Sequence, residues 1–217
     1  MTNGIAAHRA PQQKRSLAAT QRMLEAGREL LNDRDIDQIS VQDIVRVAGT
    51  SVGSFYHNFG TKDRFFATLV QEMATNREAI AMANFAGTPF DQLAKILVHG
   101  AVENHRRYQG LLRSTIRQHL SGSPVWEPIT VMGQHITEEY IRRLELHLER
   151  PLKAREKERV AFAFVWLYGI LAQSVLGLNT LSAYRIPDEL FEEETTHIFS
   201  SLLQRAVPEK PVRSRPR

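Results

Sequence analysis

Cysteine is absent from this 217-residue sequence. Its absence excludes disulfide bridges, cysteine-ligated zinc or iron–sulfur sites, a cysteine nucleophile and a thiol redox sensor. Glycine and proline are also sparse, at 12 and 9 residues, which excludes a collagen-like or low-complexity chain. The sequence therefore has to be stable through a packed core rather than through covalent links.

Long hydrophobic runs are missing as well. The longest apolar run covers residues 160–172, whereas a membrane span needs about 20 such residues. We interpret this run as a buried helix of a core. Residues 1–15 contain no apolar stretch typical of a signal peptide. The sequence therefore predicts a cytoplasmic protein with no membrane partner.

Positive charge is in excess and gathers at both ends. The net charge is +4 and the isoelectric point is about 9.6. Residues 1–28 carry one acid, Glu25, and residues 207–217 carry one, Glu209. The basic residues of these two segments are Arg9, Lys14, Arg15, Arg22, Arg28, Lys210, Arg213, Arg215 and Arg217. Such an excess favours an anionic partner without identifying it.

Helical periodicity extends over almost the whole sequence. The apolar residues Met23, Leu24, Leu30 and Leu31 lie on one face of a helix that starts near residue 16. Beyond a break at 87–89, the pattern predicts further helices, and we find no strand-like alternation. These helices cover 89–107, 109–120, 124–149, 154–179 and 188–206.

Residues 38–70 contain two short helices joined by a tight turn. Ser40 and Asp43 have the spacing of a capping box at the start of the first. Gly49 ends that helix and permits the turn, and Ser51 is a plausible N-cap for the second. A longer helix then starts after Thr61. This arrangement is typical of a helix-turn-helix.

The polar residues of this motif suit a nucleic acid. Hydroxyl groups at the start of the second helix can donate to phosphates and base edges, and Gly53 permits close backbone approach. Lys62 starts the next helix, where free amides already favour a phosphate. For Arg46, a phosphate contact and a solvated surface position both stay open, whereas we interpret Phe59 as a core residue. The candidate DNA-binding residues are Arg46, Thr50, Ser51, Val52, Gly53, Ser54, Tyr56, His57 and Lys62.

The run AGTSVGSFYHNFGTK, residues 48–62, resembles the signature of the TetR family of transcriptional regulators. The resemblance covers residues 16–76, with Thr50 where the family more often has Val and Phe65 where it more often has Leu. It implies that the second helix of the motif enters the DNA major groove and that Tyr56 and Lys62 contact phosphates. It also implies an effector-binding and dimerisation region in which helices 154–179 and 188–206 pair with those of a second chain.

We therefore predict an all-α protein, in which an N-terminal three-helix helix-turn-helix domain is joined to a C-terminal helical bundle for regulation and dimerisation. For the basic arm, a DNA contact and a merely solubilising role both stay open. The predicted divisions are a disordered arm 1–15, a DNA-binding domain 16–76 with its motif at 40–59, a regulatory domain 77–206 and a disordered tail 207–217.

Aromatic and histidine side chains of the second half suggest an effector pocket. The alternative for each is ordinary core packing. For the basic residues Arg113 and Arg117, near His105 and His119, a salt-bridged surface is favoured over an acidic ligand. The candidate pocket residues are His105, Trp126, Met132, His135, Phe162 and Trp166.

The function that these features predict is that of a homodimeric, sequence-specific transcriptional regulator without cofactor, metal or catalytic residues. In this hypothesis it is a repressor that an unknown small molecule releases from a pseudo-palindromic operator, with the helix after Thr61 as hinge. Two alternatives stay open. One is a non-specific DNA-binding protein. The other is a di-iron bundle enzyme, which would need two Glu-x-x-His motifs, whereas the sequence contains one, from Glu194 to His197.

Overall fold

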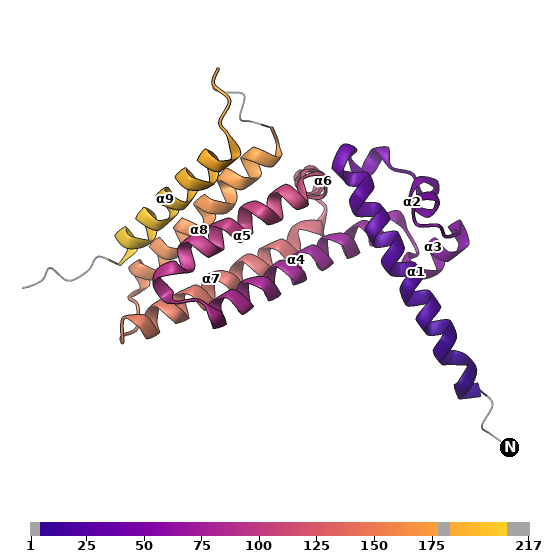
Figure 1. Ribbon diagram of the computed structural model, residues 1–217, viewed down its shortest axis with the longest axis horizontal. Coiled ribbons are helices and arrows are strands. Elements are labelled where there is room, and N and C mark those ends of the chain that lie inside the picture. Colours follow the sequence, from indigo (N-terminus) through magenta and orange to yellow (C-terminus); the bar gives the residue numbers. More distant parts are fainter. Residues whose placement is uncertain (1–4, 178–182, 208–217) are drawn as a thin grey trace, which may run out of the picture. The chain divides into compact units, whose positions relative to one another are not determined.

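The computed structural model describes residues 5–177 and 183–207, with side chains described from Ser16 onward. Within these ranges the regular elements are helical, so the all-α prediction is confirmed (Figure 1). Short 3-10 turns occupy η1 (Ile36–Gln38), η2 (Phe90–Gln92) and η3 (Pro124–Trp126). The helices are α1 (Ile5–Asp33), α2 (Val41–Val47), α3 (Val52–Phe59), α4 (Lys62–Gly87), α5 (Leu93–Arg107), α6 (Gln109–Leu120), α7 (Glu127–His147), α8 (Ala154–Val175) and α9 (Asp188–Ala206).

The chain divides into two compact units. The first unit comprises the residues up to Thr75 together with Tyr108–Ile129, and the second comprises Asn76–Arg107 together with the residues from Thr130 onward. The boundary between the two units falls within the continuous helix α4, one residue from the predicted domain boundary between 76 and 77. Helix α6 and η3, however, belong to the first unit, whereas the sequence predicts them in the regulatory domain.

A close backbone approach explains why α6 belongs to the first unit. A Cβ atom at Gly110 would lie 1.5 Å from the carbonyl oxygen of Leu31 in α1. Only glycine permits the two helices to pack this tightly, and Leu111 and Leu112 are buried beside it. Helix α6 therefore packs directly onto α1, the first helix of the same unit.

The core of the first unit contains a cluster of three phenylalanines. The ring centroids of Phe55, Phe59 and Phe65 are 4.9–5.2 Å apart, which suits tilted and edge-to-face packing. Phe59 is only 7% exposed, so its interpretation as a core residue is confirmed. Through these rings α3 is anchored to the start of α4.

The predicted ends of the chain differ from the structure in one respect. Helix α1 begins at Ile5, so the disorder predicted for 1–15 does not match residues 5–15, which are helical. Residues 1–4 of that arm lie outside the described residues, as do residues 208–217 of the predicted tail. Helix α8 ends at Val175, and residues 178 and 179 of the predicted helix also lie outside them.

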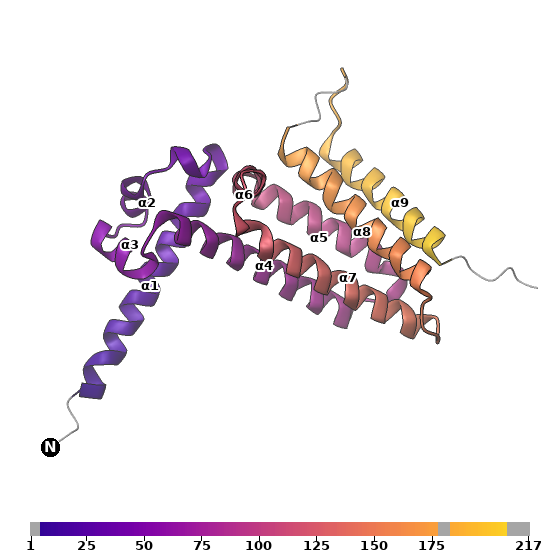
Figure 2. The ribbon, with the colours of Figure 1, turned by 180° about the vertical axis from the view of Figure 1, so that it is seen from behind.

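Helices α5, α8 and α9 lie side by side in the second unit (Figure 2). One face of α8, with Val160, Phe164 and Leu167, is buried. The interpretation of residues 160–172 as a buried helix is confirmed for this face but not for the other, where Phe162 is 60% and Val165 is 68% exposed. Across the described residues, helices lack the length and apolar character needed to span a membrane.

Candidate nucleic-acid interface and regulatory residues

Helix α2 begins at the predicted capping box. Ser40 Oγ accepts a hydrogen bond of 3.1 Å from the Asp43 amide, and Asp43 Oδ2 accepts one of 3.1 Å from the Ser40 amide. Ser40 also donates its hydroxyl to the same carboxylate. These bonds stabilise the ionised carboxylate and lower the pKa of Asp43. The start of the motif is thus fixed by residues three positions apart.

The turn between α2 and α3 has the geometry that glycine permits. Gly49 has a φ of +59°, in the left-handed region, and the Thr50 amide donates to the Val45 carbonyl at 2.9 Å. Ser51 then caps α3, because its Oγ accepts from the Ser54 amide at 3.1 Å. Both sequence predictions, the turn at Gly49 and the cap at Ser51, are confirmed.

Helix α3 has a buried face and an exposed face. Phe55 and Phe59 point into the core, whereas Tyr56 is 51% and Val52 36% exposed. The other candidates at α3 are Ser51, Gly53, Ser54 and His57. Ser54 is half-buried and the other three are exposed. The exposed face is therefore polar and faces away from the protein core.

Two further candidates lie around the turn. The Arg46 side chain is 74% exposed and its Nη2 donates to Asp43 Oδ1 at 2.8 Å. Thr50 differs from the expectation, because its Oγ1 is buried and has no hydrogen-bond partner among the described residues. The Thr50 hydroxyl is thus not exposed to a partner in this structure.

Lys62 makes contacts within the protein that the sequence did not predict. Its Nζ donates to the carbonyl oxygens of Ile36 at 2.9 Å and Ile39 at 3.0 Å. These carbonyls lie in and just after η1, and that of Ile36 also accepts from the Ile39 amide at 3.2 Å. An ammonium has three donors, so one stays available. The lysine is first of all a structural link between α4 and the segment that precedes α2.

Helix α6 holds the same segment from another direction. The Asp35 carboxylate accepts from Arg113 Nε at 2.8 Å and pairs with Arg117, and the Ile36 amide donates to Ser114 Oγ at 3.1 Å. The favoured interpretation of the two arginines as a salt-bridged surface is confirmed. We call residues 35–39, which α6 and Lys62 both hold, the bracket segment. No sequence signal pointed to it, since its partners on α6 lie 78 or 82 residues away.

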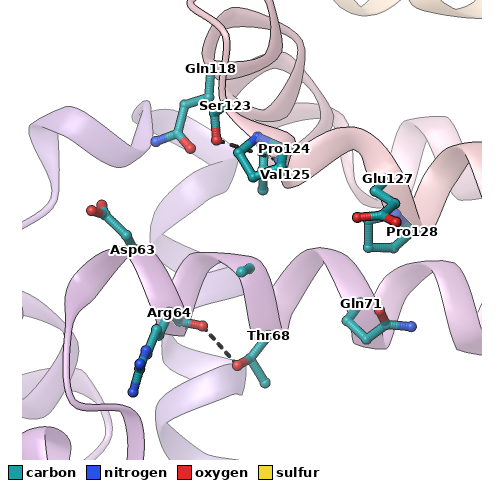
Figure 3. Close-up of a pocket in the computed structure, with 11 residues that line it drawn as sticks. Asp63, Arg64, Thr68, Gln71, Gln118, Ser123, Pro124, Val125, Glu127 and Pro128 are labelled. Atoms are coloured by element: carbon teal, nitrogen blue, oxygen red, sulfur yellow. Dashed lines mark hydrogen bonds between the residues drawn. The ribbon is translucent and has the colours of Figure 1, made fainter.

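An open groove of about 850 Å³ lies in the first unit between α4 and the segment from α6 to the start of α7 (Figure 3). Asp63 and Arg64 line it from α4, and Gln118 and Glu127 line it from the other side. None of the predicted site residues lines this groove. Charges of both signs are present, which indicates no single class of ligand.

The candidate effector residues do not form one site. Trp126 belongs to the first unit, where its ring centroid lies 5.6 Å from that of His119. Phe162 is 60% exposed, which is incompatible with the interior of a pocket. His135 is exposed and its Nδ1 lies 2.8 Å from Glu78 Oε1, so this residue contacts a carboxylate at the surface rather than lining a pocket.

The three other candidates lie within the second unit. Met132 is buried on α7, and Trp166 is half-buried on α8. His105 of α5 donates its Nδ1–H to the Ala101 carbonyl at 2.8 Å, and burial lowers the pKa of His105 to about 4. A histidine with this pKa is neutral at pH 7.

Sequence reasoning missed a charged residue in the core of this unit. Arg77 lies on α4 and is only 4% exposed. In the sequence it stands in a polar stretch that is typical of a helix surface. Its neighbours along the sequence, Asn76 and Glu78, gave no reason to expect burial. A helix presents different faces to the core as it proceeds, and only the packing shows which face Arg77 occupies.

The Glu-x-x-His spacing does not lead to a metal site. Glu194 and His197 are both exposed, and Glu139, one turn from His135, pairs with Arg142 at 2.6 Å. In the described part of the chain, no three histidine, aspartate or glutamate side chains are grouped so that they could hold a metal ion.

Comparison with known sequences concerns mainly the first unit. Residues 23–69 match the profile described as bacterial regulatory proteins, tetR family. The chain is 40% identical over 63 residues to the uncharacterized HTH-type transcriptional regulator YwcC of Bacillus subtilis, covering 29% of this chain and 28% of YwcC. It is 24% identical over 132 residues to the HTH-type transcriptional repressor AcnR of Corynebacterium glutamicum, covering 60% and 66%. The matches thus span less than two thirds of either relative.

The fold is similar to that of solved structures over nearly the whole chain. A Mesorhizobium loti protein assigned to the TetR family of transcriptional regulators superposes with a TM-score of 0.69 at 15% identity, covering 88% of this chain and 98% of that one. At this identity the likeness concerns the fold, whereas the match over residues 23–69 concerns the sequence. Residues 23–69, which include the helix-turn-helix, are thus similar in sequence to the tetR family of bacterial regulatory proteins.

Proposed function

We propose that this protein is a transcriptional repressor that binds a specific DNA operator through α3. The observation that carries the proposal is the two-sided α3, in which Phe55 and Phe59 fix the helix to the core while Tyr56 and His57 stay exposed. A helix held in this way presents its outer face rigidly, as a major-groove reader must. Exposed Arg46 on α2 adds a cation for the DNA backbone.

Gly53 supports the same role. A Cβ atom at this position would meet only Ser51 Oγ, at 4.0 Å, so the fold itself does not require glycine there. Glycine within a helix costs about 0.5–1 kcal/mol relative to alanine. A partner that approaches the backbone of α3 closely, such as a DNA phosphate, explains why the smallest residue is present.

We further propose a homodimer formed through α8 and α9, the helices predicted over 154–179 and 188–206. Large apolar side chains are exposed along both helices, and one of them, Phe162, lines a shallow groove of about 580 Å³ together with Leu202. Exposed apolar surface of this kind is typical of an interface. The exposed residues are Phe162, Val165, Leu176, Leu190 and Ile198.

A two-fold dimer presents two copies of α3 and therefore selects a pseudo-palindromic operator, with half-sites about 34–36 Å apart or a multiple of that spacing. In this proposal the small-molecule effector binds the second unit and favours a conformation with lower operator affinity. Helix α4 runs from the first unit into the second and is the expected hinge. The protein then acts in the cytoplasm and needs no cofactor.

The DNA-binding proposal is tested with a matched pair of arginines. Arg46 and Arg142 are both exposed, and each pairs with an acid three residues before it in the sequence. Operator sequences are first selected from random DNA, and affinities are then measured by fluorescence anisotropy. We expect Arg46→Ala to weaken operator binding several-fold and Arg142→Ala to leave it unchanged.

Competition with random DNA completes this test. A specific regulator prefers its operator by about 10³-fold or more. Equal affinity for selected and random DNA would instead support a non-specific DNA-binding protein, and an equal loss in both arginine variants would contradict the placement of the interface on the first unit.

The dimer proposal is tested by sedimentation. Phe162→Asp places a charge on the exposed face of α8, whereas Leu146→Asp places one at a similarly exposed leucine, 61% against 60%, on α7. We expect only the first to produce monomers at micromolar concentration. A wild-type protein that is already monomeric would refute the dimer.

A further inference from the structure

Arg77 is a buried cation with an unsatisfied donor. Its Nη2 donates to the Leu97 carbonyl at 3.2 Å, but its Nη1 is buried and has no hydrogen-bond partner among the described residues. Burial lowers the pKa of Arg77, yet a guanidinium keeps its proton in proteins. A buried charge without a counterion is costly, and proteins keep one mainly where it has a function.

No acidic side chain of the described residues is among the groups that shift the pKa of Arg77. Among the described residues, the titratable groups that act electrically on Arg77 are Tyr168 of α8 and His105 of α5. Burial raises the pKa of Tyr168, and burial lowers the pKa of His105, so that both are uncharged at pH 7. The guanidinium thus lies in the second unit near two neutral groups that can hydrogen-bond.

Buried apolar residues of α4 and α5 lie next to Arg77. On α4, Ala74 and Ala81 lie about one turn to either side and are 2% and 0% exposed. On α5, Leu97 and Ala101 are buried, and the guanidinium packs against Gly100 between them, because a Cβ there would lie 3.2 Å from Arg77 Nη1. A ligand at this position needs an apolar body as well as a charged end.

We propose that Arg77 binds the effector, and that this effector is a small organic acid whose carboxylate pairs with the guanidinium while its apolar body packs against α4 and α5. A planar carboxylate suits the fork of donors that a guanidinium presents. Tyr168 and His105 supply further hydrogen-bonding groups close to the charge. This inference rests on the proposed ligand-responsive function, which did not specify the effector's chemistry.

Burial of the site gives binding a conformational consequence. Arg77 is 4% exposed, so a carboxylate reaches it only when α4 and α5 separate. A ligand that binds better to the separated form shifts the population toward it. Because Arg77 lies on α4, which continues from the DNA-binding unit, the movement involves the expected hinge itself.

The experiment uses the full chain and two matched series of probes. Straight-chain carboxylates from acetate to decanoate, and their uncharged amides, are titrated at constant ionic strength, with thermal shift and calorimetry as readouts. We expect a carboxylate to bind roughly tenfold to a hundredfold more tightly than its amide, as the loss of hydrogen bonds to a charged group implies. Inorganic phosphate is the competing anion, and tighter binding of phosphate would overturn the assignment to a carboxylate.

Two variants assign the response to Arg77. Arg77→Met keeps an apolar side chain of similar length, and we expect it to melt at the same or a higher temperature and to lose the preference for carboxylate over amide. Arg142→Met, at an exposed position, retains the preference. Should Arg77→Met fail to fold, Arg77→Lys keeps the charge without the fork, and we expect a reduced preference.

The proposal is overturned if carboxylates and amides bind alike at every chain length, or if the preference survives in the Arg77 variants. Operator binding is measured separately, so the two failures are distinguishable. Specific DNA binding without any carboxylate response refutes only this inference, whereas a carboxylate response in a protein with no DNA preference refutes only the proposed function.

Discussion

The helix-turn-helix and the helical bundle satisfy their polar groups in different ways. In the motif, Ser51 Oγ bonds to the Ser54 amide, three residues away. In the bundle, His99 pairs with Glu192, 93 residues away, and Arg77 leaves one nitrogen without a partner in the described structure. The caps of the motif are thus fixed by local bonds, although Asn58 also accepts from Ser16 and Thr20 of α1. The contacts of His99 and Arg77 depend instead on how distant helices pack.

This difference bears on function. A region fixed by neighbouring residues keeps one shape, which a DNA reader needs, and a region with an unsatisfied buried charge has an alternative state that a ligand can stabilise. The bracket segment departs from this rule, because it belongs to the DNA-binding unit but is held by distant residues of α6 and α4. The following changes test where the rule holds.

The largest expected effect comes from Gly110→Ala. Its Cβ would lie 1.5 Å from the Leu31 carbonyl oxygen, and a backbone atom cannot move aside as a side chain does. We expect a loss of more than about 3 kcal/mol in the free energy of unfolding, measured by denaturant titration. Gly87→Ala is the control, because a Cβ there meets nothing within 4 Å. Equal stability of the two variants would show that α6 does not pack on α1.

Lys62→Ala comes next. It removes the donor to the Ile36 and Ile39 carbonyls, and we expect a loss of about 1–3 kcal/mol in unfolding free energy together with weaker DNA binding. Tyr56→Phe, on the exposed face, should weaken DNA binding without this loss of stability. A Lys62 variant with normal stability and a smaller salt dependence of DNA binding would instead support the interpretation of Lys62 as a phosphate contact.

Gly53→Ala should act in opposite directions on stability and binding. The fold leaves room for a methyl group, so we expect a gain of about 0.5 kcal/mol in unfolding free energy. Operator affinity, measured by anisotropy, should fall because the added methyl lies between α3 and the DNA. An unchanged affinity would show that the backbone of α3 does not approach its partner closely.

The smallest effect concerns the pH dependence of the bundle. Burial lowers the pKa of His105 to about 4, against about 6.5 for an unfolded histidine, so the unfolded chain binds more protons between these values. The contribution of this residue to stability is therefore complete above pH 6.5 and is lost as the pH falls toward 4. Plots of melting temperature against pH for the wild type and His105→Leu should run parallel above pH 6.5 and converge or cross below it. Curves parallel down to pH 4 would contradict the burial of this histidine.

Much of the motif was predictable because its bonds are local. The caps at Ser40 and Ser51 and the turn at Gly49 follow from residue types at fixed spacings, and each is found in the structure. Helix ends in the second half also fall near their predicted places, since proline and glycine mark them. The same reasoning gave Phe59 its place in the core.

The site residues that depend on distant contacts were not predictable in this way. Lys62 was assigned to phosphate because its position at a helix start suits an anion, but two carbonyls from an earlier turn occupy its ammonium. Phe162 was placed in a pocket for its aromatic character, but it lies on the outer face of α8. Residue type alone does not reveal which face of a helix is covered.

The amino-acid order by itself determined the helical class, the turn with its two caps and the kinship of residues 23–69 with a family of regulators. These depend on bonds and spacings within one or two helical turns. Tertiary structure decided that α6 joins the DNA-binding unit, that Lys62 supports the bracket segment and that Arg77 is buried. Each of these arises from contacts between segments far apart in the sequence, which no local pattern encodes.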